Sequence, residues 1–542
     1  MKMHRRSVLQ QIGCGMLALG LDRSSFAEKR SQDHHPVNLP RSTPESQGVS
    51  SGSILNFLAA AEQAKHELHS VMLLRHGCVV AEGWWAPYRA DAVHSLYSLS
   101  KSFTATAVGF AVMAGALRLS DRVISFFPDQ LPNEITSNLA TLTVEHLLTM
   151  SVGHSIEPSG RMTREDDWVR AFLAVPITYE PGTRFLYSSG ASYMLSAIVQ
   201  KVTSQRMLDY LQLQLFGALG ISGARWECCP RGINTGGWGL SMTTESLAKF
   251  GQFYLQEGVW NDTRLLSAEW IRTATRSHIR LALDSENPRT RADTRVTSLS
   301  LDRAIDWDQG YGYHFWRCRY GAFRGDGALG QLCIIMPAQD AILVTTARTG
   351  AIQGLLNLVW EHLLPGARER SLPADTRTNL QLNRKLKSLM LQPPSGVSTP
   401  VGVKAYEEFD LDPNELGAKR ASLTFREKLC RFALELADGT VESRCAIGIW
   451  LDGITNMPGA PPGLRETRDT KLVKVAAAGA WQDGQTFHIQ LRYYETPHYD
   501  VVTCRFDSDE ITIEFTNDII ETHSAPNRFR RRVLRGRALH RA

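Results

Sequence analysis

Hydrophobic positions follow two different periods along the chain. Up to about residue 365, apolar residues recur at the spacing of amphipathic helices or form longer apolar runs, with short strand-like runs between them. The helices predicted by this pattern cover 53–66, 98–117, 191–202, 245–256 and 352–364. Apolar runs at 71–75 and 78–82 flank His76-Gly77, which predicts two strands around a tight turn.

Beyond about residue 400 the hydrophobic period is two. Alternating runs separated by turn residues, as at Asp438-Gly439 and Asp483-Gly484, predict antiparallel strands. The predicted strands cover 421–425, 432–436, 474–481, 486–494, 499–506 and 510–516. We expect an all-β sheet or barrel with lipocalin-like spacing, in which we identify no chemistry. Tyr493, Tyr494 and His498 are interpreted as aromatic core, with a pocket lining as the alternative.

A length of 542 residues exceeds what one hydrophobic core usually serves, so we expect two domains. Two polar, proline-containing stretches, 28–49 and 367–400, are interpreted as linkers, with a short helix over 380–391 as an alternative for part of the second. They place the first domain at 50–366 and the all-β domain at 401–527.

The net charge of +5 is concentrated at the C-terminal end of the chain. Residues 528–542 include seven arginines and no acidic residue, which leaves a net charge of about −2 elsewhere and argues against a nucleic-acid-binding body. We interpret 528–542 as a solvated basic tail, with binding to a membrane or polyanion as the alternative.

Residues 1–27 have the organisation of an export signal. Arg5-Arg6 precede a weakly apolar stretch that runs to Leu21, and Ser25-Phe26-Ala27 supply small residues for cleavage. The arginine pair resembles a twin-arginine signal, so we expect a periplasmic or secreted protein. A disordered cytoplasmic leader is the alternative. No later segment has the 18 to 20 uninterrupted apolar residues of a membrane span.

The nine cysteines show neither C-x-x-C spacing nor an accompanying histidine cluster. We therefore expect no metal and no cofactor. Adjacent Cys228 and Cys229 are poorly placed to pair with each other. We expect buried free thiols, and disulfides are the alternative.

Ser98-Leu99-Ser100-Lys101 begins the apolar helix and supplies candidate chemistry. Residues three apart on a helix share a face, so the hydroxyl of Ser98 and the amine of Lys101 should be neighbours. A serine hydroxyl is a weak nucleophile until a base takes its proton, and a lysine in an apolar wall can be that base. Free N–H groups at the helix N-terminus favour negative charge on an attacked carbonyl. A capped core helix is the equal alternative on spacing and setting alone.

The same S-x-x-K spacing recurs at Ser246 and Lys249. Thr243 or Thr244 is a candidate N-cap there, and Lys249 is expected to be an exposed helix charge. The spacing cannot choose between the two pairs, but the apolar setting favours Ser98.

The segment 97–129, YSLSKSFTATAVGFAVMAGALRLSDRVISFFPD, resembles the nucleophile segment of the serine β-lactamase and penicillin-binding superfamily. It is most similar to the class C-like β-lactamase-related serine hydrolases, over roughly residues 40–365. The resemblance implies an α/β (α+β) fold, with a central antiparallel sheet flanked by helices and an appended all-β domain. It also implies an acyl-enzyme on Ser98, with Lys101 in the proton relay.

Tyr187 lies in a segment, 181–190, that resembles the family's Tyr-x-Asn motif. By this resemblance its phenol helps to deprotonate the serine and then protonates the leaving group, which a nearby ammonium assists. Ser189 stands where most members carry Asn, so an amide that could hold a substrate carbonyl is missing. An aromatic core plug is the alternative for Tyr187.

Two glycine-containing segments complete the resemblance. The first, 235–244, lacks a phosphate-loop pattern and resembles a tight loop that Trp238 lines beside the cleft. In the second, Gly325-Asp326-Gly327 stands where the family has Lys or His, a small residue and Gly, so the cation that engages β-lactam and D-peptide carboxylates is absent. The resemblance assigns the oxyanion hole to the amides of Ser98 and Ala328, and substrate contacts to Ser189, Trp238, Asp326 and Gly327.

These features predict a serine hydrolase that acts on small esters or amides through Ser98, Lys101 and Tyr187. The alternative enzyme is a β-lactamase or D-alanyl-D-alanine carboxypeptidase. A catalytically silent binding or sensor protein with the same cleft is the alternative from another class. We expect a small ester, amide or peptide as partner, without nucleic acid or stable membrane insertion. The physiological substrate and the oligomeric state are left open.

Overall fold

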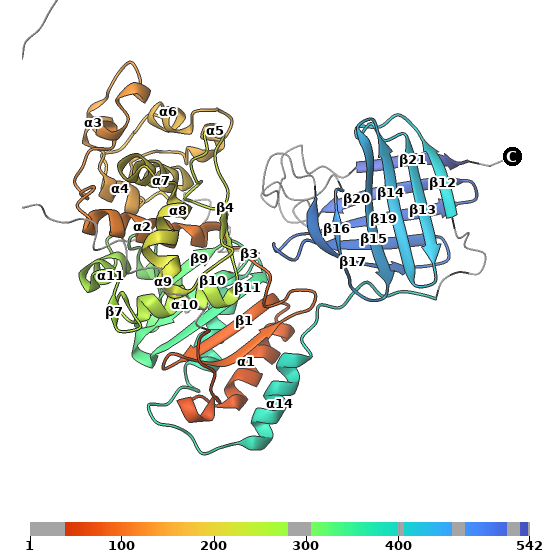
Figure 1. The fold of residues 1–542 in the computed structure, drawn as a ribbon, viewed down its shortest axis with the longest axis horizontal. Coiled ribbons are helices and arrows are strands. Elements are labelled where there is room, and N and C mark those ends of the chain that lie inside the picture. The colour runs from red at the N-terminus through yellow and green to blue at the C-terminus, as the bar shows by residue number, and fades with distance from the viewer. Residues whose placement is uncertain are drawn as a thin grey trace, which may run out of the picture.

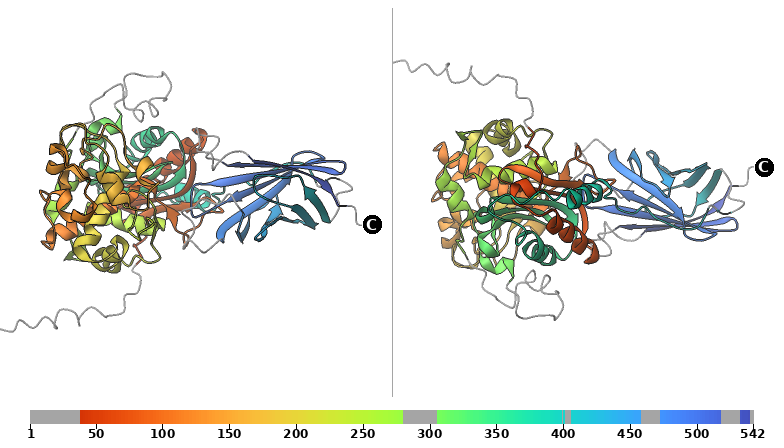
Figure 2. Two further views of the ribbon diagram at one scale, coloured as in Figure 1. Left: turned by 90° about the horizontal axis from the view of Figure 1, so that it is seen from above. Right: turned by 90° about the horizontal axis from the view of Figure 1, so that it is seen from below.

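The computed structural model describes residues 38–279, 305–398, 400, 406–457, 472–517 and 532–539. The predicted export signal at 1–27 lies outside these ranges. Within them, the chain forms an α+β domain and a β domain that lie next to each other along the long axis of the molecule (Figure 1). The views in Figure 2 show the β domain projecting from one side of the first domain.

The first domain is built on an antiparallel sheet of six strands in the order β2-β1-β11-β10-β9-β8. The strands are β1 (Glu67–Arg75), β2 (Cys78–Trp84), β8 (Trp316–Arg317), β9 (Phe323–Gly327), β10 (Gln331–Met336) and β11 (Ala341–Arg348). β1 and β2 form the predicted hairpin, and His76 and Gly77 have the positive φ values that its tight turn requires. The predicted central antiparallel sheet is confirmed.

Helices cover both faces of this sheet, because alternate residues on each strand enter opposite cores. The helices that form these layers are α1 (Ser51–Gln63), α2 (Ser100–Met113), α7 (Ser189–Thr203), α10 (Thr244–Leu255), α13 (Ile352–Leu358), its π-helical continuation η9 (Val359–Leu363), and α14 (Thr376–Lys387). Met72 and Leu74 of β1 pack in the core with α2, α7 and α10, whereas Leu73 packs in the core with α1, α13 and α14. All five predicted helices are present.

Shorter elements complete the first domain. The additional helices are α3 (Ser137–Thr141), α4 (Val144–Leu148), α5 (Ser159–Met162), α6 (Trp168–Leu173), α8 (Met207–Leu211), α9 (Gly217–Leu219) and α11 (Ala268–Thr275). Three short strands, β3 (His94–Ser95), β4 (Arg225–Trp226) and β5 (Leu240–Met242), form a second sheet in the order β3-β5-β4. A two-stranded sheet joins β6 (Val259–Trp260) and β7 (Thr263–Arg264).

The segment 367–400, which we interpreted as a linker, contains helix α14. Leu382 of this helix is buried in the core beneath α1, and the following Leu389 is buried there as well. α14 packs on α1 and β2 at the lower edge of the first domain in Figure 1. This part of the segment therefore covers the sheet as well as leading to the next domain.

The β domain is a sheet that closes on itself. Its strands are β12 (Tyr406–Leu411), β13 (Arg420–Arg426), β14 (Leu429–Leu436), β15 (Gly439–Ile447), β16 (Leu451–Thr455), β17 (Val473–Trp481), β18 (Thr486–Arg492), β19 (Tyr499–Asp507), β20 (Glu510–Asn517) and β21 (Arg532–Ala538). Their order is β15-β14-β13-β12-β21-β20-β19-β18-β17-β16, and a short parallel pairing of β15 with β17 closes a ring of nine described strands. All six predicted strands are confirmed.

The interpretation of 528–542 as a solvated tail is wrong for Arg532–Ala538, which form β21 between β12 and β20. Leu534 points into the domain core, whereas Arg535 and Arg537 are exposed. The charged positions alternate with inward-facing positions, as expected for one face of a strand. The basic composition therefore concealed a strand with the same period as its neighbours.

Two general expectations concern the described part of the chain. No helix in it is both long and apolar enough to cross a bilayer. Its eight cysteines carry free thiols, and six of them are buried, whereas Cys78 is half-buried and Cys228 is exposed. The expectation of free thiols is therefore confirmed there, although burial does not extend to Cys228.

Candidate active site

Ser98 lies in a single 3-10 turn, η2 (Tyr97–Leu99), directly before helix α2. The preceding Tyr97 has φ 50°, a left-handed conformation that is unfavourable for a residue with a side chain. The carbonyl oxygen of Tyr97 accepts a hydrogen bond from Ser100 Oγ at 2.6 Å, and Ser100 Oγ accepts one from the Leu240 amide at 3.1 Å. These bonds fix the turn that carries Ser98 against strand β5.

Lys101 is 1% exposed, and its amine joins three segments of the chain. Nζ donates to the carbonyl oxygen of Gly237 at 2.6 Å, to Ser189 Oγ at 3.1 Å and to Ser98 Oγ at 3.2 Å. These acceptors come from the turn before α2, from the start of α7 and from the glycine-rich loop. The predicted Ser98–Lys101 pair is therefore in direct contact.

Tyr187 lies over the amine of Lys101, whose Nζ is 4.7 Å from the centre of the phenol ring. The half-buried ring also packs on Trp316, with centroids 5.7 Å apart and planes 22° apart. Tyr311 contacts the ring edge to face at 6.2 Å. Burial, together with the nearby Tyr187 and Asp326, raises the pKa of Tyr311 well above its ordinary value, so Tyr311 stays neutral. The structure thus brings Tyr187 to the Ser98–Lys101 pair.

Ser189 is the first residue of α7, and the helix start positions its hydroxyl. The preceding Ser188 is the N-cap, and its Oγ accepts from the Ala191 amide at 3.1 Å. Glu157 Oε1 accepts from Ser188 Oγ and from the Gly190 amide, both at 3.1 Å. A carboxylate at a helix N-terminus is stabilised by the free amides there. Glu157, which the sequence did not single out, therefore supports the segment that carries Tyr187 and Ser189.

The glycine-rich loop contributes a backbone acceptor to the site. A Cβ atom on Gly236, which has φ 67°, would lie 2.5 Å from the Ser192 carbonyl oxygen, and one on Gly237 would lie 2.9 Å from that of Ser189. Only glycine allows so close an approach to α7. The approach brings the Gly237 carbonyl to Lys101, whereas the half-buried Trp238 stacks on Trp168 at 5.8 Å.

Strand β9 passes directly over the turn that carries Ser98. A Cβ atom on Gly327 would lie 2.1 Å from the Leu96 carbonyl oxygen, and one on Gly325 would lie 3.0 Å from Ser102 Oγ. Both glycines therefore face the start of α2, and the exposed Ala328 follows beside it. β9 therefore lies next to the turn that carries Ser98, and the assignment of the Ser98 and Ala328 amides to an oxyanion hole stays a prediction.

Arg324 and Asp326 occupy the opposite face of β9 from the two glycines. Arg324 is fully buried, and its Nε donates to Asp326 Oδ2 at 2.7 Å, while its guanidinium lies 4.4 Å from the centre of the Trp307 ring. Burial raises the pKa of the Asp326 carboxyl, and Arg324 opposes that shift. As expected from strand geometry, Arg324 does not replace the cation that is absent at Gly325.

His314 supports the site from beneath α2, a role that the sequence did not indicate. Its Nδ1 donates to the Lys101 carbonyl oxygen at 3.0 Å, and its own carbonyl oxygen accepts from Ser102 Oγ at 2.8 Å. Burial, with a smaller effect from the nearby Lys101, lowers the pKa of His314 to about 3. The ring is therefore neutral near pH 7 and acts as a fixed hydrogen-bond donor.

The second S-x-x-K pair is built differently, and the expectation that Lys249 is exposed is wrong. Lys249 is 4% exposed, and its Nζ donates to the Gly220 carbonyl oxygen at 3.2 Å. Burial lowers the pKa of Lys249. Ser246 hydrogen-bonds Thr243, which is the N-cap of α10 as predicted. This serine belongs to a helix cap.

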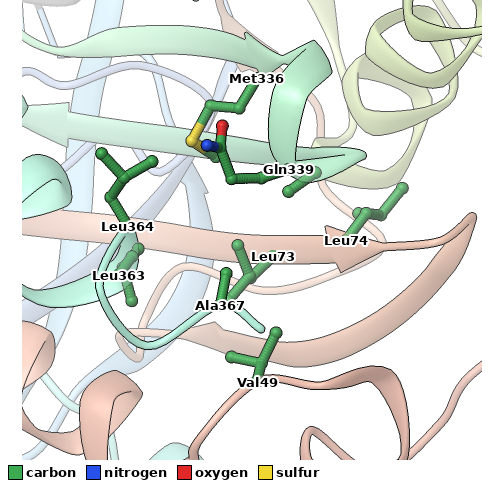
Figure 3. Close-up of a pocket in the computed structure, with 9 residues that line it drawn as sticks. Val49, Leu73, Leu74, Met336, Gln339, Leu363, Leu364 and Ala367 are labelled. Carbon is green, nitrogen blue, oxygen red and sulfur yellow. The ribbon is translucent and has the colours of Figure 1, made fainter. Parts of the chain in front are cut away.

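The apolar pocket in Figure 3 lies at the other end of the sheet. Its lining includes Leu73 and Leu74 at the end of β1 and Met336 at the end of β10. Ser98 lies near the start of β10, because Gln331 pairs with Gly327. The pocket is therefore separate from the candidate site.

The β domain reaches the candidate site through the loop between β18 and β19. His498 Nε2 makes a short hydrogen bond with the hydroxyl of Tyr97, and Arg89 donates to the hydroxyl of Tyr494 at 3.2 Å. Tyr493 alone is buried in the β-domain core, with its hydroxyl on Asp500 at 2.6 Å. Tyr494 and His498 are buried as well, but at the contact with the first domain, where Tyr494 clusters with Tyr88 and Ala476.

Residues 58–352, more than half of the chain, match the family described as Beta-lactamase. The chain belongs to the Beta-lactamase family. This Beta-lactamase family member is 26% identical over 232 residues to 6-aminohexanoate-dimer hydrolase of Paenarthrobacter ureafaciens, an alignment that covers 40% of this chain and 59% of the relative. It is 24% identical to lovastatin esterase of Penicillium rubens, over 26% of this chain and 41% of the relative. The chain thus spans less than two thirds of either relative.

Among solved structures, the octameric penicillin-binding protein homologue from Pyrococcus abyssi is similar at 15% identity and a TM-score of 0.45. That similarity covers 89% of this chain and 99% of the homologue.

Proposed function

We propose that the protein is a serine hydrolase that forms an acyl-enzyme on Ser98. The proposal rests on one observation. Ser98, Lys101 and Tyr187 lie together in the structure, although Tyr187 is far from the other two in the sequence. A buried lysine that contacts a serine hydroxyl beneath a phenol ring provides both a nucleophile and a route for its proton. The family supports the same class of reaction.

In the proposed acylation step, Ser98 Oγ bonds to the substrate carbonyl carbon while its proton passes to the relay formed by Lys101 and Tyr187. The amides of Ser98 and Ala328 stabilise the oxyanion. When the bond to the leaving group breaks, the relay returns the proton to that group. Water then releases the acyl group by the reverse proton route, which restores Ser98.

The proposed substrates are small esters or amides. At position 325, where a cation would engage a substrate carboxylate, the chain has Gly, and Arg324 is committed to Asp326. Ser189 hydrogen-bonds Lys101, so the hydroxyl at this position serves the relay as well as the cleft. Trp238 and Gly327 are retained as proposed substrate contacts, whereas Asp326 is not, because it lies on the opposite face of β9 and binds Arg324. The paired arginines near the N-terminus support a periplasmic or secreted location.

The proposal is tested by covalent labelling of the full chain. The protein is mixed with a p-nitrophenyl ester or, separately, with a penicillin, and the mass of the intact protein is measured at short times. An added acyl mass with the ester supports the proposed reaction. An adduct with penicillin alone would support β-lactamase or carboxypeptidase activity instead, and no adduct with either reagent would support a catalytically silent protein.

A further inference from the structure

The loop that joins β18 and β19, residues 493–498, lies against the segment that leads to Ser98. The Ser95 amide donates to the Glu495 carbonyl oxygen at 2.8 Å, and the Tyr88 hydroxyl donates to the Thr496 carbonyl oxygen at 3.0 Å. His498 then reaches Tyr97, the residue next to Ser98. With the bond from Arg89 to Tyr494, the β domain therefore contacts at least four positions in the eleven residues from Tyr88 to Ser98.

Ion pairs of two buried side chains, Arg492 just before the loop and Glu495 within it, hold this loop in place. The carboxylate of Glu495 accepts from Arg225 of the first domain at 2.6 Å and from Lys474 of the β domain at 3.0 Å. Arg492 binds Glu67 through two hydrogen bonds of 2.8 and 3.2 Å. Two-pronged arginine–carboxylate contacts fix orientation as well as distance. The contact is thus built to hold the loop in one position relative to the first domain.

Tyr97, the residue before Ser98, has a strained backbone conformation. Its φ of 50° persists only if its surroundings hold it there. Inside the first domain, Ser100 holds the backbone carbonyl of Tyr97. The side chain is held from the other domain, by the bond between its hydroxyl and His498.

We propose that His498 is a positioning residue for the hydrolase, and that the β domain completes the active site through it. By fixing the ring of Tyr97, His498 fixes the strained backbone from which Ser98 begins, and thereby the direction of the nucleophile and of the Ser98 amide. This inference rests on the proposed serine hydrolase function. It assigns no proton transfer to His498.

The test compares four variants of the full-length chain by ester turnover, with the amount of active enzyme taken from the acylation burst. His498→Ala and Tyr97→Phe should each lower kcat about three- to tenfold, the effect of one neutral hydrogen bond, with little change in KM. The double variant should lose no more than either single variant, because both remove the same bond. His498→Gln, whose amide can replace Nε2, should recover most of the activity.

A matched control separates positioning from general loosening of the domain contact. Asp452 forms an exposed ion pair of 2.6 Å with Arg89 across the same contact, and Asp452→Asn removes it. This variant should retain wild-type kcat and KM. The inference is overturned if His498→Ala acts like wild type, if the losses in the double variant add, or if Asp452→Asn loses as much activity as His498→Ala. An unlabelled wild-type Ser98 would instead overturn the proposed function itself.

Discussion

The two S-x-x-K helices of this chain have the same spacing and different surroundings. Lys101 and Lys249 are both buried, and each donates to a backbone carbonyl. Lys101 also reaches its own serine, Ser98, and a hydroxyl on another helix, beneath the ring of Tyr187. Lys249 has the cap-forming Ser246 as its motif partner. A buried lysine and S-x-x-K spacing are therefore common to both pairs, and the chain segments that pack against each pair distinguish the candidate site from the helix cap.

The difference arises from what packs against each helix start. The start of α2 lies between β9, the glycine-rich loop and the start of α7, and glycines at 236, 237, 325 and 327 permit each approach. The start of α10 follows the short strand β5 and faces the main sheet. Three independent chain segments therefore meet at Ser98, which is what a reaction with a nucleophile, a relay and an oxyanion requires.

Replacing each serine by alanine should give the largest difference in activity between the two S-x-x-K pairs. Ser98→Ala should lower ester turnover by at least about 10⁴-fold, because the proposed nucleophile is lost. Ser246→Ala should leave turnover unchanged and cost about 1 kcal/mol of stability or less, because only its hydroxyl hydrogen bond with Thr243 is lost and the N-cap bond to its amide is kept. Initial rates and thermal unfolding of the two variants measure these effects. Equal losses of activity would refute the assignment.

Replacing the two lysines should produce a smaller difference in ester turnover. Lys101→Met removes the relay amine and should lower turnover about 10²- to 10⁴-fold. Lys249→Met replaces a buried amine with an apolar side chain of similar volume, so its stability should stay within about 1 kcal/mol of wild type. Steady-state kinetics and urea unfolding provide the readouts. A Lys249→Met enzyme that is as inactive as Lys101→Met would contradict the account.

Removing the hydroxyl of Tyr187 tests whether this residue transfers a proton. Tyr187→Phe keeps the ring between Lys101 and Trp316 and should lower turnover about 10²-fold through loss of proton transfer. An ester with a better leaving group needs less protonation and should be less affected. A uniform loss across leaving groups would indicate a packing role, which was the alternative interpretation of this residue.

The smallest expected effect concerns the pH dependence of stability. Burial lowers the pKa of His69 and of His154 to about 4, and that of His314 to about 3. Below about pH 6.5 the unfolded chain therefore binds protons that the folded chain does not, so stability falls as pH decreases toward 4. His314→Asn keeps a donor for Lys101 and removes one of these protons. Its slope of unfolding free energy against pH should be shallower by up to about 1.4 kcal/mol per pH unit.

Urea unfolding between pH 7 and pH 4 measures that slope for wild type and variant. A small loss of stability at pH 7 is expected for the smaller side chain and does not bear on the result. An unchanged slope would mean that His314 is protonated in the folded protein.

Local patterns in the sequence were enough to predict much of the fold. Apolar periodicity located the helices around α2 and α7, and period-two alternation located six strands of the β domain. The strand β21 was missed because two of its outward positions are the arginines Arg535 and Arg537, so that composition concealed its alternation. Lys249 was misjudged for a related reason, since a charged residue was assumed to be solvated although its aliphatic chain can be buried.

The residues that support the candidate site through tertiary contacts could not be predicted from local sequence patterns. Lys101 binds the backbone carbonyl of Gly237, and His314 binds the backbone carbonyl of Lys101. Glu157 binds an amide at the start of α7. Such contacts leave no motif in the sequence. His498 lies 401 positions from its partner Tyr97, so no local pattern links the two. The sequence motifs named the reacting groups, whereas the supporting contacts depend on how distant segments pack.

The central claim is that Ser98, and not Ser246, is the acylated residue. The direct measurement is mass spectrometry of proteolytic peptides from protein quenched during turnover of a p-nitrophenyl ester. The account predicts the acyl mass on the peptide that contains Ser98, in wild type and in Ser246→Ala, and its absence in Ser98→Ala. An acyl group that persists in Ser98→Ala, or that maps to another serine in the wild type, would contradict it.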